Sequence, residues 1–337
     1  MRLVFLGSPP FAVPVLARVL ASGRHEVRAL VTRPDKPQGR GRKVEGSPLV
    51  ALARADGVRV LQPTTTKDPA FVAELRALAP DALLVASYGE ILREDVLGIA
   101  RHGALNVHGS LLPRWRGAAP VQAAILAGDA ETGVCVQRMV LALDEGDVLE
   151  GVTRRTPIGP RETAGELFDR LAELGGEAAV AALDALEGGT ARFVPQDASQ
   201  ASYARKIAKE HGRIDWTRSA EELERFVRAM TPWPGARTSA SGGRELVVLD
   251  VAVVEAAPEP LVHRLGRDVL GIPDGRPAEP SFAAGEPGRA LELGGALFVV
   301  TGRGLLELRA LKPAGKAAMS AAEWLRGARL GSEERFG

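Results

Sequence analysis

The sequence predicts an α/β protein whose first part is a parallel β-sheet covered by helices on both faces, followed by a smaller, β-rich domain. Short, continuously apolar runs alternate with segments of helical periodicity through the first half of the chain. Strands that are apolar on both faces are typical of such a covered parallel sheet. From residue 246 onward, short β-like runs separated by glycines indicate a small barrel or sandwich.

The elements of the first part follow one another in order. Gly23 ends the first expected helix, and Ser47 with Pro48 is typical of an N-cap followed by proline in the first helical turn. We expect strands at residues 3–6, 27–32, 58–61, 82–86, 104–108 and 134–140. We expect helices at residues 11–21, 48–56 and 69–78 and from about 120 onward.

The second part begins after a change in composition near residues 187–202, which we interpret as an interdomain linker. A helix at residues 219–230 is indicated by Ser219 with Glu222 three positions later, a capping box. Strands are expected at 246–254, 289–293, 297–301 and 305–311. Residues 256–288, rich in proline and glycine, are expected to form a long loop.

Composition excludes several classes of protein. In 337 residues, 45% are hydrophobic, which is enough for a sizeable core, and no apolar run approaches the roughly 18 residues that span a bilayer. A single cysteine excludes an intrachain disulfide framework, so we expect a reducing, cytoplasmic location. The net charge of +1 excludes a globally basic nucleic-acid-binding coat.

One segment is locally basic. Residues 33–43 (RPDKPQGRGRK) hold five basic residues and one acid together with two prolines and two glycines, so regular secondary structure is not expected there. Two interpretations stay open: an ordinary solvated loop, or an arm that contacts phosphates. The first glycine-rich turn lacks the three-glycine dinucleotide fingerprint, which argues against a nicotinamide or flavin site.

The residues that point to chemistry follow the strand at 104–108. Asn106 and His108 are two apart, so both project from one face, at the carboxyl end where α/β sheets bind ligands. Asp144, in the turn after the strand at 134–140, is expected to meet His108 from a neighbouring strand end. An imidazole can take a proton from an amine, an amide can donate to an oxyanion, and a carboxylate can orient the imidazole.

This set suits direct acyl transfer to an amine, which needs no Ser or Cys nucleophile. The alternative stays open on spacing alone: His108 as a hydrogen-bonded core residue and Asn106 as a turn cap. Metal binding is not expected, because the five histidines show no paired ligand spacing apart from His102 and His108, six residues apart.

At these residues the chain resembles the methionyl-tRNA formyltransferases over almost its whole length. Residues 106–120 (NVHGSLLPRWRGAAP) match the central motif of that family, and 143–147 (LDEGD) match the segment that carries its catalytic Asp. Further matches lie at 7–14, 33–41, 86–92, 128–134, 213–216 and 313–320. Ala142 and the length of the 256–288 loop depart from the family pattern.

The resemblance implies a Rossmann-like formyltransferase domain at 1–189, a linker at 190–208 and an OB-like β-barrel tRNA-binding domain at 209–337. It implies formyl transfer from 10-formyltetrahydrofolate to the α-amino group of methionine on initiator methionyl-tRNA, for translation initiation, by a monomer without metal. Asn106, His108 and Asp144 are then catalytic. The folate site is then lined by Ser110, Leu111, Leu112, Pro113, Tyr88, Gly89, Ile91 and Leu92. The tRNA contacts are then Arg40, Arg42, Lys43, Lys206 and Lys209.

Two alternatives remain at this stage. The first is another folate formyltransferase with the same Asn, His and Asp set. The glycinamide ribonucleotide formyltransferases are shorter and lack the C-terminal barrel. The hydrolase domain of formyltetrahydrofolate dehydrogenase and the amino-sugar formyltransferases resemble this architecture more closely, but they generally lack the basic loop and the terminal PAGK stretch. A catalytically silent tRNA-binding protein is the other alternative, and the intact Asn106, His108 and Asp144 argue against it.

Overall fold

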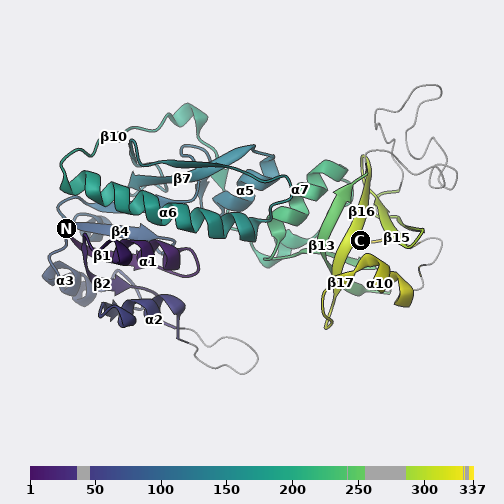
Figure 1. The fold of residues 1–337 in the computed structure, drawn as a ribbon, viewed down its shortest axis with the longest axis horizontal. Coiled ribbons are helices and arrows are strands. Elements are labelled where there is room, and N and C mark those ends of the chain that lie inside the picture. The colour runs from purple at the N-terminus through teal and green to yellow at the C-terminus, as the bar shows by residue number, and fades with distance from the viewer. Residues whose placement is uncertain (36–45, 241, 255–285, 329, 331–333) are drawn as a thin grey trace. The chain divides into compact units, whose positions relative to one another are not determined.

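The computed structural model describes residues 1–35, 46–240, 242–254, 286–328, 330 and 334–337. By their internal contacts these residues form two compact units (Figure 1). Unit 1 comprises residues 1–124, 130–158 and 166–206, and unit 2 comprises 125–129, 159–165 and 207–337. Within the described residues, no helix has the length and apolar character needed to cross a membrane.

Unit 1 carries most of the alternating strands and helices. They are β1 (Arg2–Gly7), α1 (Ala12–Ser22), β2 (Glu26–Val31), α2 (Pro48–Ala55), β3 (Arg59–Leu61), α3 (Pro69–Ala77), β4 (Ala82–Ala86), α4 (Glu94–Leu97), β5 (Ala104–His108), β6 (Arg116–Gly117), β7 (Glu131–Arg138), β8 (Val148–Leu149), β9 (Arg154–Pro157), α6 (Ala164–Glu187), β10 (Phe193–Val194), η1 (Ala198–Gln200) and β11 (Tyr203–Ala204). The six strands expected from the sequence in this part are present, and Gly23 ends α1 in the left-handed conformation as expected.

The main sheet has the order β10-β8-β7-β5-β4-β1-β2-β3, with β9 paired to β7. Strands β1 to β5 pair in parallel, as expected, but β7 runs antiparallel to β5, so the sheet is mixed rather than parallel throughout. Cys135 pairs with His108 and Arg138 pairs with Leu105, so the chain re-enters at the edge where β5 ends. A strand that enters at that edge must run antiparallel.

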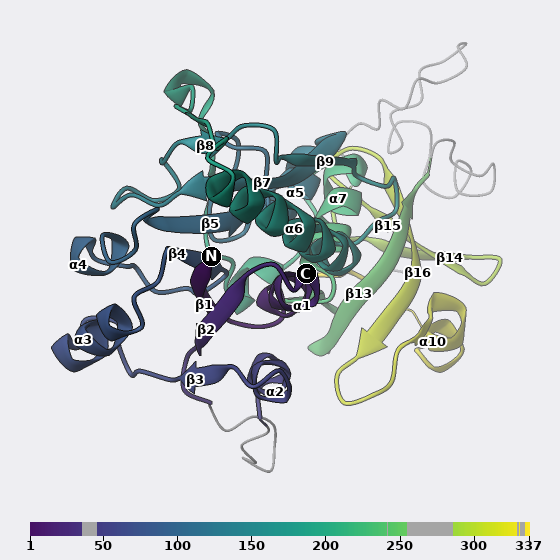
Figure 2. The same ribbon diagram turned by 60° about the vertical axis from the view of Figure 1, so that its left-hand side comes forward.

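Helices α1 and α6 pack together on one face of this sheet (Figures 1 and 2). Two glycines in the middle of α6 allow the close approach. A Cβ at Gly175 would meet Val107 of β5 at 3.1 Å and Val15 of α1 at 3.3 Å, and one at Gly176 would meet Arg18. The opposite face is covered by α3 and α4, whose apolar residues form a core with Val4, Leu6, Ala29, Val31, Leu83, Val85 and Ala104.

Unit 2 is an antiparallel β-sheet with flanking helices. Its elements are η2 (Lys209–Gly212), α7 (Ala220–Met230), β12 (Ala236–Ala240), β13 (Arg244–Val253), β14 (Ala290–Leu293), β15 (Ala296–Val300), β16 (Leu305–Pro313), β17 (Met319–Ser320) and α10 (Ala321–Gly327). The residues of α5 (Pro120–Ala127) are divided between the two units, with 120–124 in unit 1. The strand path is β12-β13-β16-β15-β14, with β17 paired to β16.

The capping box of α7 is formed as the sequence predicts, with Ser219 Oγ accepting from the Glu222 amide. The same signal is present at Ser320 and Glu323, and it begins α10, which the sequence analysis missed. The expected long loop at 256–288 lies outside the described residues, apart from its last three.

The segment at 190–206 pairs with two short strands of unit 1. Strand β10 lies antiparallel to β8, and β11 lies parallel to β6 in the turn that follows β5. The Ser202 carbonyl accepts from the Arg116 amide at 2.8 Å and the Ala204 carbonyl accepts from Ala118 at 2.9 Å. This segment therefore holds the turn that follows the strand of Asn106 and His108.

Candidate active site

The structure brings Asn106, His108 and Asp144 together. Asn106 Nδ2 donates to Asp144 Oδ1 at 3.4 Å, and His108 Nδ1 lies 3.8 Å from Asp144 Oδ2. Asn106 and His108 share one face of β5, as the two-residue spacing predicts. Asp144 meets His108 from the loop after the neighbouring strand β7, as expected. Because β7 is antiparallel, it ends beside Leu105, and the loop after it folds back to the two side chains.

The side chain of Asp144 is mostly covered and is held by neutral donors. Its side chain is 11% exposed. Oδ2 accepts from the Gly117 amide at 2.8 Å, and Oδ1 accepts from Gln137 Nε2 at 2.7 Å. Its φ of +54° is in the left-handed region, which a non-glycine residue adopts at a cost of about 1–3 kcal/mol when the surroundings determine it. Strain of this kind is concentrated at functional sites.

His108 is 5% exposed and has an oxygen near each ring nitrogen. Nε2 lies 3.0 Å from the carbonyl oxygen of Trp115, and Nδ1 faces Asp144. Trp115 has a φ of +61°, and its amide donates to Ser202 Oγ at 3.0 Å. The turn after β5 therefore closes over the imidazole and positions a backbone carbonyl at its outer nitrogen.

The expected folate-site residues of this turn differ in burial. Ser110 is fully buried, and its hydroxyl donates to the Arg114 carbonyl at 2.7 Å, so it stabilises the turn. Leu111, Leu112 and Pro113 are half-buried. Only these three of the four side chains therefore offer surface to a ligand.

The second expected folate segment follows β4. Tyr88 and Leu92 are 2% and 3% exposed and belong to the apolar core, where burial raises the pKa of the Tyr88 hydroxyl to about 12. Gly89 has a φ of +74°, and its carbonyl accepts from the Arg33 guanidinium. Ile91 is 74% exposed and is the apolar side chain that this segment presents to solvent.

Several residues at this site were missed from the sequence. Val140, Leu141 and Leu143 are exposed apolar side chains in the loop of Asp144, and an apolar run before an Asp-containing turn was an available signal for them. Gln137 and Gln196 contact Asp144 or its backbone, and no sequence signal distinguishes them.

The expected tRNA contacts are less defined. Arg40, Arg42 and Lys43 lie outside the described residues. Lys206 and Lys209 are both exposed, the first at the end of unit 1 and the second in η2. Neither forms an ion pair within the part of the chain that the structure describes.

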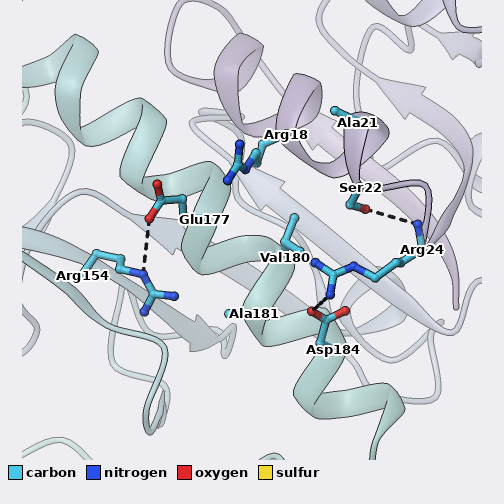
Figure 3. Close-up of a pocket in the computed structure, with 9 residues that line it drawn as sticks. All are labelled: Arg18, Ala21, Ser22, Arg24, Arg154, Glu177, Val180, Ala181 and Asp184. Carbon is cyan, nitrogen blue, oxygen red and sulfur yellow. Dashed lines mark hydrogen bonds and ion pairs between the residues drawn. The ribbon is translucent and has the colours of Figure 1, made fainter.

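A separate cavity of about 520 Å³ lies between α1 and α6 (Figure 3). It contains none of the expected site residues. Two of the three arginines that line it are paired with carboxylates, Arg24 with Asp184 at 2.6 Å and Arg154 with Glu177 at 3.7 Å. The described residues also contain no group of three or more His, Cys, Asp and Glu side chains that could hold a metal ion.

Comparison with known proteins identifies the family of the chain. The formyl transferase family profile matches residues 1–183, and the profile of its C-terminal domain matches residues 206–329. A methionyl-tRNA formyltransferase of Anaeromyxobacter dehalogenans is 49% identical over 304 residues, covering 89% of this chain and 91% of the relative. One of Frankia casuarinae is 42% identical, covering 100% of this chain and 96% of the relative.

Solved structures with under 25% identity share the fold. An N-formyltransferase from Helicobacter canadensis, in complex with folinic acid and dTDP-3-aminofucose, has a TM-score of 0.62 at 15% identity, over 91% of this chain and 98% of its own. HypX from Aquifex aeolicus, in complex with tetrahydrofolic acid, has a TM-score of 0.59 at 18% identity over 96% of this chain. The chain spans about half the length of HypX, 47%. By its full-length relatives and both family profiles, this chain belongs to the methionyl-tRNA formyltransferases.

Proposed function

We propose that this protein transfers the formyl group of 10-formyltetrahydrofolate to the α-amino group of methionine on initiator methionyl-tRNA. The product, formylmethionyl-tRNA, links one-carbon metabolism to translation initiation. The observation that carries the proposal is the meeting of Asn106, His108 and Asp144 in a chain of this family.

The reaction is a direct acyl transfer. The methionyl nitrogen forms a bond to the formyl carbon, and the bond between that carbon and N10 of the folate breaks. The attacking amine gives its proton to His108, and N10 leaves with a proton. In this structure Nε2 of His108 contacts the Trp115 carbonyl, so the amine takes the place of that carbonyl as the partner of Nε2.

The other two side chains act on charge. Asn106 donates from its amide to the formyl oxygen as negative charge develops there, a contribution worth about 3–4 kcal/mol per donor in a protease. Asp144 keeps the imidazole in place and balances its positive charge, as the third member of a triad does.

The folate site lies around the loops that flank β5. Leu111, Leu112 and Pro113 offer the half-buried surface, and Ile91 with Gly89 offers the exposed part of the segment after β4. Ser110, Tyr88 and Leu92 support these surfaces from within the fold. The flat faces of the pteridine and aminobenzoyl rings also suit the exposed Val140, Leu141 and Leu143 beside Asp144.

The tRNA is bound through phosphate contacts. Arg40 interacts with the acceptor end, Arg42 and Lys43 bind nearby phosphates, and Lys206 and Lys209 are further contacts. In this proposal residues 1–189 are the catalytic domain, 190–208 connect the domains, and 209–337 bind tRNA. The protein acts as a monomer in the cytoplasm.

The test is formyl transfer from 10-formyltetrahydrofolate with three acceptors in competition: methionyl initiator tRNA, an amino-sugar nucleotide and water. We expect formylated methionyl-tRNA as the main product. Formylation of the sugar or release of formate instead would retain the folate chemistry and refute the tRNA acceptor.

A further inference from the structure

Two glutamine side chains connect Asp144 to parts of the chain that the proposed mechanism does not otherwise use. Gln137 lies on β7, and its Nε2 donates to Asp144 Oδ1 at 2.7 Å. Gln196, after β10, donates from its own Nε2 to the backbone carbonyls of Asp144 at 2.8 Å and Gly146 at 2.7 Å. Gln196 Nε2 also donates to Gln137 Oε1 at 3.4 Å, so the two side-chain amides are hydrogen-bonded to each other.

Gln137 fixes one oxygen of the carboxylate. The side chain is 1% exposed, and its Nε2 contact with Asp144 is shorter than the Asn106 contact with the same oxygen. The Gly117 amide holds the other oxygen. With both oxygens held, the carboxylate plane cannot rotate, and Oδ2 stays toward the Nδ1 of His108.

Gln196 fixes the backbone that carries this carboxylate. Asp144 has a φ of +54°, a conformation that persists only when the surroundings impose it. Gln196 binds carbonyls on both sides of Glu145. Its own Oε1 accepts from Arg116 Nε at 3.1 Å, and Arg116 is 4% exposed.

The donors around Asp144 are uncharged. Among the residues described, the one titratable cation within ion-pair distance of Asp144 is His108. Neutral amides orient a carboxylate without neutralising it, so its charge remains available to the imidazole. A lysine or arginine in the place of Gln137 would orient the carboxylate and also compete with His108 for its charge.

We infer that Gln137 is a positioning residue for Asp144 in formyl transfer, and that Gln196 supports it through the linked amides and the turn backbone. The inference rests on the proposed function. Gln137 touches neither substrate in this account and acts only through Asp144. Its loss therefore lowers kcat and leaves the KM for either substrate unchanged.

The first experiment replaces Gln137 by methionine, which has a similar volume and no donor. Steady-state formylation of methionyl initiator tRNA is measured with both substrates varied. We expect kcat to fall about 10- to 100-fold, the size of effect that a misplacement near 1 Å produces, with both KM values within about twofold of wild type. Thr132→Val is the matched control, since it removes a buried polar group from the same strand without a contact to Asp144.

A double-mutant cycle separates positioning from a purely structural role. In an Asp144→Asn background, Gln137→Met is expected to change the residual rate by less than about twofold, because the group on which it acts is already altered. A full 10- to 100-fold loss in that background would overturn the inference. So would wild-type kcat in Gln137→Met.

A second variant covers the outcome that Gln137→Met does not fold. Gln196→Met leaves β7 intact and is expected to lower kcat by about 3- to 10-fold at unchanged KM. An unchanged kcat in this variant would overturn the inference that Gln196 supports the positioning of Asp144. Failure of the proposed function is distinguishable, because the wild-type protein would then not formylate methionyl-tRNA in any of these assays.

Discussion

Two aspartates of unit 1 are held in opposite ways. Asp144 is 11% exposed and accepts hydrogen bonds from a backbone amide and two neutral side-chain amides. Asp184, at the cavity of Figure 3, is 34% exposed and pairs with Arg24 at 2.6 Å and with His25 at 3.1 Å. The charge of Asp184 is neutralised locally, which makes its role structural. The charge of Asp144 is oriented but not neutralised, which leaves it to act on His108.

The largest effect is expected when the partner of that charge is removed. His108→Ala takes away the proton acceptor and should lower kcat about 10²- to 10⁴-fold, the usual contribution of a general acid–base catalyst. Binding of tRNA, measured by filter retention, should stay near wild type. A kcat within tenfold of wild type would show that the buried cluster is structural, as the alternative interpretation of His108 holds.

Arg40 tests whether a positive charge in the basic segment at 33–43 contributes to tRNA binding. If Arg40 contacts the acceptor end of the tRNA, Arg40→Ala should lower kcat/KM for methionyl-tRNA about tenfold and leave the KM for 10-formyltetrahydrofolate unchanged. The slope of the logarithm of the tRNA binding constant against the logarithm of salt concentration should also become shallower, by the amount that about one phosphate contact contributes. Unchanged formylation at limiting tRNA would assign residues 33–43 to an ordinary solvated loop.

Tyr88 lies beside the site but belongs to the core. Burial raises its pKa to about 12, while an unfolded tyrosine has a pKa near 10. Between pH 10 and pH 12, Tyr88 is therefore mostly ionised in the unfolded chain and mostly protonated in the folded one. The free energy of unfolding should therefore fall as pH rises from about 10 to 12, by an amount on the order of 2 kcal/mol.

Urea unfolding at pH 8 and pH 11 measures this effect. Tyr88→Phe cannot ionise and should lose less stability between these two pH values than the wild-type protein does. Equal losses in the two proteins would place the Tyr88 hydroxyl in solvent rather than in the core.

The smallest effect is expected at the cavity. Asp184→Asn weakens a partly exposed ion pair, so the free energy of unfolding should change by about 1 kcal/mol or less. Formylation should stay within about twofold of wild type. A tenfold loss of kcat would show that the two aspartates are not as different as their partners indicate.

The sequence predicted several elements of the fold and of the site because their signals are local. Two residues of spacing place Asn106 and His108 on the same face of the strand at 104–108. Three residues of spacing identify the capping box that begins at Ser219. The direction of β7 was not predictable, since a strand that is buried along both faces has the same pattern in either direction.

The contacts around Asp144 were also beyond the sequence. Gln137 and Gln196 are 59 residues apart, and a glutamine carries no signal of the partner it will have. Strands β6, β10 and β11 have two residues each, too few for a periodicity to be detected. Their pairing makes the segment at 190–206 part of the site's support, although its composition resembles that of a linker.

The most direct test of the central claim is the single-turnover rate of formyl transfer to methionyl initiator tRNA in the Asp144→Asn variant. Asparagine keeps the shape of the side chain and its accepting oxygen but not its charge. The account predicts a loss of at least about 10²-fold in the transfer rate, with folate binding, tRNA binding and the melting temperature near those of wild type. A variant that transfers the formyl group at the wild-type rate would show that the charge of Asp144 does not serve the chemistry.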